Sequence, residues 1–175
     1  MTASEYSEDA LIEQPTIGLF SDMHWETANC YTETFLPGGG SQGRETPEDV
    51  VLVRRLRPAL VEFNPNLPAE AIDLAITELT RDRRTMSMVH ANREISQLLR
   101  EGIKVSYKNP AVETVTENVK VIDWQHPEKN KFFLASQFWI TGDLYKRRCD
   151  LVGFVNGIPL MVMENKASHK NLKKA

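Results

Sequence analysis

Two carboxylates and a lysine stand near the end of the sequence, at a spacing that suits hydrolysis of a phosphodiester. They are Asp150, Glu164 and Lys166, at the open end of two apolar strands joined at an Asn-Gly dipeptide. Two carboxylates can hold a hard divalent cation such as Mg²⁺, which neutralises charge on a phosphate and acidifies bound water. Lys166 follows Glu164 by two residues and so lies on the same strand face, where its ammonium can orient water or stabilise the phosphate. The pattern therefore predicts metal-dependent phosphodiester cleavage.

The same three residue types also fit a plain interpretation, because two acids and a lysine at loose spacing are common. Asp150 would then end a strand, and the Glu-Lys pair would be solvated. The apolar hairpin favours a site, since three ionisable side chains gather at one end of strands that otherwise carry no charge.

The parity of the hairpin decides whether the two carboxylates share a face. Faces alternate along each strand, so Asp150 joins Glu164 only if the numbers of paired residues sum to an even value. A two-residue Asn-Gly turn gives an odd sum. We therefore predict a three-residue loop, Val155 to Gly157, or equally a β-bulge near Pro159, which donates no ladder hydrogen bond.

The hairpin is part of a longer pattern. Residues 147–166 read Arg-Arg-x-Asp-Leu-Val-x-Phe-Val-Asn-Gly-Ile-Pro-Leu-x-Val-x-Glu-x-Lys, and the pattern extends upstream through residues 50–57, 64–68, 121–124 and 136–138. These stretches span most of the chain. Through them, the chain resembles the nuclease domain of the restriction (R) subunit of type I restriction-modification enzymes, in the PD-(D/E)xK nuclease superfamily. The resemblance implies an α/β restriction-endonuclease-like core, with a mixed central β-sheet flanked by helices.

The resemblance also implies an activity: an endodeoxyribonuclease that cleaves DNA with Mg²⁺. Asp150 and Glu164 would be metal ligands, Lys166 the catalytic lysine, and the backbone carbonyl of Asn165 a further ligand. Double-stranded DNA and the methylation and specificity subunits of a type I complex would be its partners. An ATP-driven translocase would lie outside this chain, which has no Gly-x-x-x-x-Gly-Lys-Ser/Thr loop. We interpret the chain as an N-terminal fragment that alone cleaves weakly or not at all.

Two features depart from the family pattern. The residue between Glu164 and Lys166 is usually apolar and is Asn165 here, and the Gln-x-x-x-Tyr motif expected on a following helix is not found before Ala175. The alternative is a non-catalytic DNA-binding or subunit-docking module that keeps the nuclease fold. Retention of all three charged residues argues against it, because a scaffold has no need to hold two carboxylates together against their repulsion.

Charge is divided unevenly along the chain, although the net charge is −3. Residues 1–80 hold 4 basic and 14 acidic side chains, whereas residues 81–175 hold 17 and 10. The basic part contains the candidate site, and basic side chains contact phosphates irrespective of sequence. We expect DNA contacts from the following residues, although each run also fits a solvated surface: Lys146, Arg147, Arg148, Lys170 and Lys173.

A third acid can come from an expected N-terminal helix. Glu8 and Glu13 lie on it, and many nucleases of this superfamily use a helix-borne Glu, although a solvated acid is the plainer interpretation of either. The two cysteines, Cys30 and Cys149, do not have zinc-site spacing. The sequence shows neither an apolar leader segment nor eighteen consecutive apolar residues, so we expect a cytoplasmic protein with no membrane partner.

The remaining patterns predict where the elements lie within a single nuclease domain of residues 1–175. Residues 1–102 are expected to be mainly helical, residues 103–166 to form the sheet, and residues 167–175 to begin a helix. Helices are predicted over residues 46–61, after Pro68 and over 86–101, and strands over 103–107, 119–124 and 132–140. The helix after Pro68 is expected to carry Ile72, Ala75, Ile76 and Leu79 on one apolar face, and the helix over 86–101 to stop at Gly102. Trp124 and Trp139 are predicted as core.

Overall fold

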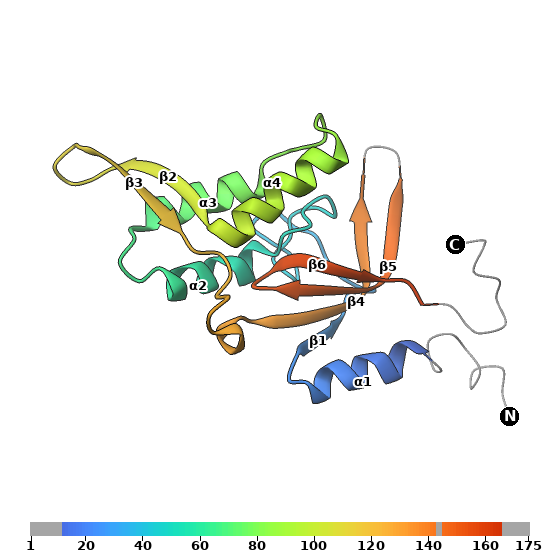
Figure 1. The fold of residues 1–175 in the computed structure, drawn as a ribbon. Helices are drawn as coiled ribbons and strands as arrows, with labels where there is room; N and C mark the ends of the chain where they lie inside the picture. The colour runs from blue at the N-terminus through green and yellow to red at the C-terminus, as the bar shows by residue number, and fades with distance from the viewer. Residues whose placement is uncertain (1–11, 143–144, 166–175) are drawn as a thin grey trace, which may run out of the picture. The chain divides into compact units, whose positions relative to one another are not determined.

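The computed structural model describes residues 12–142 and 145–165, which form two compact units (Figure 1). The first unit combines residues up to Leu52 with those from Phe132 onward, and the second is Val53–Lys131. The first holds a four-stranded sheet in the order β1-β4-β5-β6, and the second holds a two-stranded sheet, β2-β3. The expected α/β fold, with a mixed sheet and flanking helices, is confirmed.

The first unit is built around the four-stranded sheet. Its elements are α1 (Gln14–Asp22), β1 (Glu26–Asn29), β4 (Phe132–Thr141), β5 (Lys146–Val155) and β6 (Ile158–Met163). β1 runs parallel to β4, whereas β4, β5 and β6 are antiparallel neighbours. α1 packs against β1 and β4, and Figure 1 shows it beside β1. The sequence did not predict β1, which lies in the part expected to be mainly helical.

The β5–β6 hairpin turns on two residues. Asn156 and Gly157 have φ values of 52° and 82°, as a type I′ turn requires, and Val155 pairs with Ile158. The predicted three-residue loop is therefore wrong. Asn and Gly tolerate left-handed backbone at low cost, so the short turn that matches the strand twist is available here.

The other predicted device, a β-bulge near Pro159, is confirmed. Phe154 pairs with Pro159, but Gly153 pairs with Met161, so β6 carries one extra residue. Proline has no N–H to continue the ladder, and a bulge accommodates that gap. Beyond the bulge, the residue numbers of each pair, such as Leu151 and Met163, sum to an even value, as a shared face for Asp150 and Glu164 requires. Continued by one pair beyond the end of the ladder, this register sets Asp150 opposite Glu164.

The helix predicted from residue 46 begins only at Val53, as α2 (Val53–Phe63). Before it, residues 46–49 form a turn in which the Thr46 N–H donates to Asp49 Oδ2 at 2.9 Å. Leu52 is fully buried, and its N–H donates to the Gly157 carbonyl at 2.8 Å. The prediction failed because this tertiary hydrogen bond and the burial of Leu52 hold the segment out of the helix.

The second unit contains α2, α3 (Ala69–Thr80), α4 (Met88–Glu101), β2 (Ile103–Lys108), β3 (Thr114–Val119) and a 3₁₀ turn over Pro127–Lys129. The apolar face predicted for α3 is buried as expected: Ile72, Ala75, Ile76 and Leu79. α4 ends at Gly102, which has φ 83°. None of the helices in the described ranges is long and apolar enough to cross a membrane.

The strand predicted over residues 119–124 is wrong, because β3 ends at Val119. Asp123 is buried, and its Oδ1 accepts hydrogen bonds from the N–H groups of Gln125 and His126. These local bonds turn the chain instead of extending it. Trp124 is consequently 56% exposed and is not a core residue, although its Nε1 donates to the Leu99 carbonyl at 2.9 Å.

Gly40 is a position where a side chain cannot fit without movement. A Cβ there would lie 1.6 Å from the Thr34 carbonyl oxygen. We expect Gly40→Ala to lower the free energy of unfolding by about 3 kcal/mol, because backbone must shift to relieve the clash. Gly18→Ala is the matched control: a Cβ in α1 meets nothing within 4 Å, and this change should raise stability by about 1 kcal/mol. Urea denaturation measures both, and equal midpoints for Gly40→Ala and wild type would contradict the expectation.

Candidate active site

A cavity of about 420 Å³ opens in the first unit beside Asp150. Its lining comes from the start of α1, the end of β1, the middle of β4 and β5, and the chain just past β6. The residues are Glu13, Gln14, Asn29, Tyr31, Gln137, Arg148, Asp150 and Asn165. The sheet and α1 together therefore position the polar groups of the site.

Glu13 directly precedes α1 and is only 5% exposed. Gln137 on β4 donates from Nε2 to Glu13 Oε2 at 2.7 Å. Because α1 packs against β1 and β4, Glu13 reaches the same cavity as Asp150. Of the two acids considered for an N-terminal helix, Glu13 lies at this cavity, and Glu8 is outside the described residues.

Asp150 is partly buried on β5 and contacts the chain that follows β6. The Asn165 N–H donates to Asp150 Oδ2 at 2.8 Å. The hairpin therefore brings Asp150 beside Asn165, as its register requires. The Asn165 side-chain nitrogen is buried and has no hydrogen-bond partner among the described residues.

Glu164 is exposed and does not line the cavity. The register of the hairpin nevertheless sets Glu164 opposite Asp150, one pair beyond the ladder. Burial raises the pKa of the Cys149 thiol, and the charges of Glu164 and Asp150 raise it further. Within the described ranges, no three His, Cys, Asp or Glu residues gather closely enough to hold a metal ion. Lys166, like Lys170 and Lys173, lies outside the described residues, so its place at the site stays a prediction.

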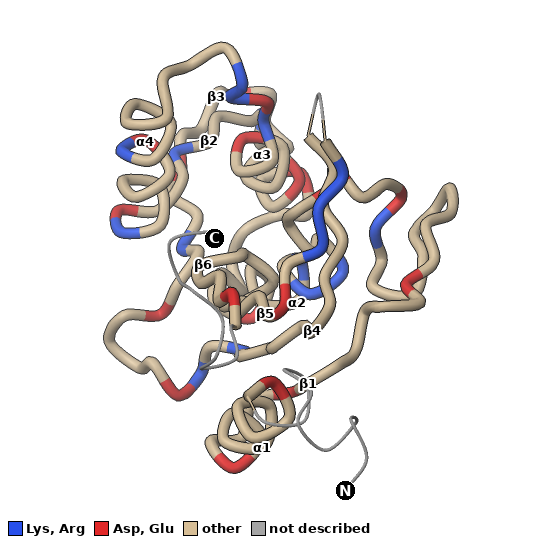
Figure 2. The backbone as a smooth tube through the Cα atoms, turned by 90° about the vertical axis from the view of Figure 1, so that its right-hand side faces the viewer, with Lys and Arg blue, Asp and Glu red and all other residues tan. Residues whose placement is uncertain are grey.

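Basic and aromatic side chains lie next to Asp150. Figure 2 shows the start of β5 as a continuous blue stretch, which comprises Lys146, Arg147 and Arg148. Lys146 Nζ lies 4.5 Å from the centre of the Trp139 ring, and Arg148 Cζ lies 5.2 Å from that of Tyr31. Trp139, predicted as core, is partly exposed, and Arg148 Cζ also lies 5.5 Å from the centre of its ring.

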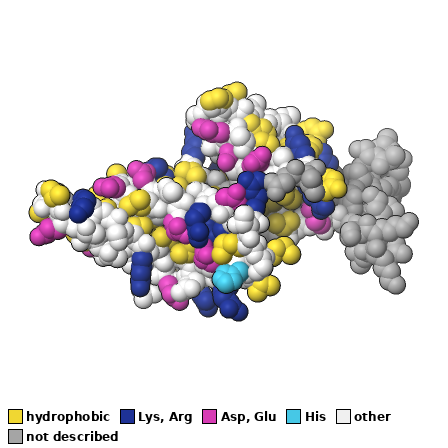
Figure 3. All heavy atoms as spheres, turned by 90° about the horizontal axis from the view of Figure 1, so that it is seen from above, with side chains coloured by type: hydrophobic (Ala, Val, Ile, Leu, Met, Phe, Trp, Pro, Cys, Tyr) yellow, Lys and Arg dark blue, Asp and Glu magenta, His cyan; other side chains and the backbone are white. Residues whose placement is uncertain are grey.

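The face of the molecule in Figure 3 does not single out a DNA-binding region among the described residues. On the side shown in Figure 3, basic and acidic side chains are interspersed. The three consecutive basic residues of β5 are therefore the stronger candidates for DNA contacts, because they precede Asp150 on the same strand.

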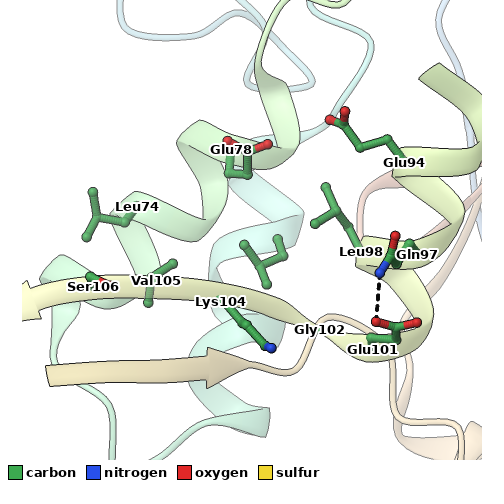
Figure 4. A pocket seen from close by; sticks show the side chains of 11 residues that line it. Leu74, Glu78, Glu94, Gln97, Leu98, Glu101, Gly102, Lys104, Val105 and Ser106 are labelled. Atoms are coloured by element: carbon green, nitrogen blue, oxygen red, sulfur yellow. Dashed lines mark hydrogen bonds between the residues drawn. The ribbon is translucent and has the colours of Figure 1, made fainter. Parts of the chain in front are cut away.

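A second pocket, of about 540 Å³, lies in the second unit among α3, α4 and β2 (Figure 4). It is lined by three glutamates, but Arg83 donates to both Glu78 and Glu94, at 3.1 and 2.8 Å. Glu101 accepts a hydrogen bond from Gln97 at 2.9 Å, drawn in Figure 4. Because an arginine offsets the charge of two of the three carboxylates, this pocket is a poorer cation site than the cavity at Asp150.

The sequence did not indicate four of the residues at the cavity as site residues: Gln14, Asn29, Tyr31 and Gln137. Asn29 and Tyr31 belong to β1 and the loop after it, which no local pattern predicted. Gln137 lies in the Ser-Gln-Phe stretch that contributes to the family resemblance, but its left-handed backbone, with φ 55°, has no signal in the sequence.

A mixed sheet flanked by helices, with Asp150 of the β-hairpin and Glu13 at one cavity, is consistent with a nuclease-like α/β fold. Residues 5–175 match the family model described as the type I restriction enzyme R protein N terminus, and the chain belongs to this family. The family resemblance is thus confirmed.

Two curated relatives agree with this assignment. The chain is 32% identical to the "Type I restriction enzyme HindI endonuclease subunit" of Haemophilus influenzae over 89% of its own length, and 33% identical to the "Putative type I restriction enzyme MjaIXP endonuclease subunit" of Methanocaldococcus jannaschii over 73%. It spans only 14% and 12% of those two proteins.

Proposed function

We propose that this chain is the Mg²⁺-dependent endonuclease domain of a type I restriction enzyme R subunit and hydrolyses phosphodiester bonds of double-stranded DNA. The observation that carries the proposal is the meeting of Asp150 with Glu13 at one cavity and with the Asn165 backbone at 2.8 Å. The hairpin and α1 thereby bring acids from distant parts of the sequence to one place.

The donor chemistry at this cavity suits Mg²⁺. Carboxylate oxygens are hard ligands, and Asp150 and Glu13 offer them from the cavity lining. We assign these two acids and Glu164 as the residues that hold the ion, with the backbone carbonyl of Asn165 as a further donor. Once bound, Mg²⁺ would supply positive charge to the phosphate and acidify water.

The other roles fall to basic residues. Lys166 is proposed as the catalytic lysine, because its ammonium is a compact charge that can orient water or stabilise a phosphate. Lys146, Arg147 and Arg148 are proposed to contact the DNA backbone, with the aromatic rings of Trp139 and Tyr31 restraining two of these cations. We assign the same role to Lys170 and Lys173.

The partners follow from family membership and remain part of the proposal. The chain covers a small share of its relatives, so we assign ATP-driven translocation to a part of the subunit outside this chain. We likewise propose assembly with methylation and specificity subunits. Because the isolated chain is expected to cleave weakly or not at all, cleavage has to be assayed in the complete complex.

Cation binding by the chain itself provides the direct test. We expect calorimetric titration with Mn²⁺, as a stand-in for Mg²⁺, to detect a site whose affinity falls at least about tenfold in Asp150→Asn, because a ligand loses its charge. Asp82→Asn is the matched control, since Asp82 is an exposed aspartate of the second unit paired with Arg84. Equal affinity for wild type and Asp150→Asn would place the ion elsewhere and contradict the assignment.

A further inference from the structure

Gln137 has an unusual backbone for a residue inside a strand. Its φ is 55°, in the left-handed region that side chains other than glycine rarely adopt. Its neighbours pair regularly with β5, Ser136 with Leu151 and Phe138 with Cys149. The same register sets Gln137 opposite Asp150. A strained conformation of this kind persists only where the surrounding structure requires it, and such residues cluster at functional sites.

The left-handed residue changes which side chains of β4 face the core. Phe133 and Ala135 are two residues apart and Phe138 is three further on, yet all three belong to one buried cluster. Alternate residues share a face in a regular strand, so the backbone at Gln137 shifts the alternation by one position. The strain thereby keeps the phenylalanines buried while the Gln137 side chain lines the cavity that Asp150 also lines.

At the cavity, the Gln137 amide binds one of the acids. Its Nε2 donates to Glu13 Oε2 at 2.7 Å, and Glu13 is almost completely buried. This hydrogen bond fixes the orientation of the Glu13 carboxylate. An amide does this without a charge of its own, whereas a lysine or arginine in its place would compete with a bound cation.

We propose that Gln137 is the positioning residue of the site, which holds the Glu13 carboxylate toward Asp150 so that the two acids share one divalent cation. The left-handed backbone of Gln137 directs this amide from β4 into the cavity. The inference rests on the proposed function, because it assumes that a cation binds at Asp150.

Gln137→Gly separates positioning from folding. Glycine adopts φ 55° freely, so this variant of the full chain should melt at or above the wild-type temperature. Its Mn²⁺ affinity, measured by calorimetry without DNA, should nevertheless fall about 10-fold to 100-fold, as loss of a residue that orients a metal ligand typically does. His24→Gly is the matched control: His24 also has positive φ, 64°, but does not line the cavity. It should gain stability and keep wild-type affinity.

A second variant, Gln137→Asn, tests the same inference if Gln137→Gly does not fold. Asparagine tolerates left-handed backbone better than most residues, so Gln137→Asn keeps the conformation but carries an amide one carbon short of Glu13, and it should also lose affinity. Wild-type affinity in either folded variant overturns the inference and leaves the proposed function standing. Failure of both variants to fold would make Gln137 purely structural and overturn it equally. A wild-type chain that binds no cation overturns both.

Discussion

Asp150→Ala is expected to abolish DNA cleavage by the complete restriction complex, with a loss in cleavage rate on the order of 10³-fold or more. Asp150 lines the cavity at which Glu13 also lies, and its carboxylate accepts the Asn165 N–H. Removal of this carboxylate deletes a proposed metal ligand and the contact between β5 and the segment after β6. Glu164→Ala and Lys166→Ala should have similarly severe effects, and double variants should be little worse, because groups that act on one phosphate as a unit are not additive.

The measurement is nicking and linearisation of a plasmid that carries a recognition site, with ATPase activity followed in parallel. ATP hydrolysis should stay within a few-fold of wild type, because the proposed motor lies outside this chain. Asp82→Ala provides a matched control on the second unit. Cleavage by Asp150→Ala within a few-fold of wild type would refute the catalytic assignment. A wild-type complex that binds DNA and hydrolyses ATP without ever cleaving would instead support the non-catalytic module.

Arg44→Met is expected to lower the free energy of unfolding by about 3 to 5 kcal/mol, because it leaves a buried charge without its partner. Arg44 is 1% exposed, and its Nε donates to Glu33 Oε1 at 2.9 Å. Its terminal nitrogens also donate to the Trp139 carbonyl at 3.0 Å, and the guanidinium lies 3.9 Å from the centre of the Phe138 ring. These contacts tie the long loop after β1 to the segment of β4 that follows Gln137.

Controls distinguish loss of the ion pair from loss of packing. Arg44→Met combined with Glu33→Gln should recover part of the stability, because neither charge is then left unpaired. Arg84→Met removes an exposed arginine that pairs with Asp82, and it should cost less than about 1 kcal/mol. Denaturant unfolding of the four proteins provides the comparison. A loss below about 1 kcal/mol for Arg44→Met would show that the buried pair contributes little to stability.

Local sequence was sufficient for much of the fold. The hairpin at Asn-Gly, although not its two-residue turn, the buried face of α3 and the glycine that ends α4 were predicted, because each depends on residues within a few positions of one another. Parity alone required a bulge or a longer loop in the hairpin if Asp150 was to meet Glu164. The sequence could not choose between these devices, since both give pair sums of the even parity that puts Asp150 and Glu164 on one face.

Other features depended on contacts between distant segments. The helix predicted from residue 46 does not form before Val53, because the Leu52 N–H donates to the Gly157 carbonyl. The short strand β1 is stabilised by its pairing with β4. Neither partner is visible from the local pattern. Trp139 was predicted as core from its hydrophobicity. It lies beside Lys146 instead, because the register of β4 and β5 sets its neighbours.

The candidate site divides in the same way. The sequence alone determined that Asp150 and Glu164 could meet, because one hairpin joins them and the period of a strand is fixed. Only the tertiary structure decided that Glu13 joins Asp150 at the cavity and that Gln137 binds it, since both depend on α1 packing against β1 and β4. That packing is the sum of many weak contacts spread along the chain, so no short stretch of sequence encodes it.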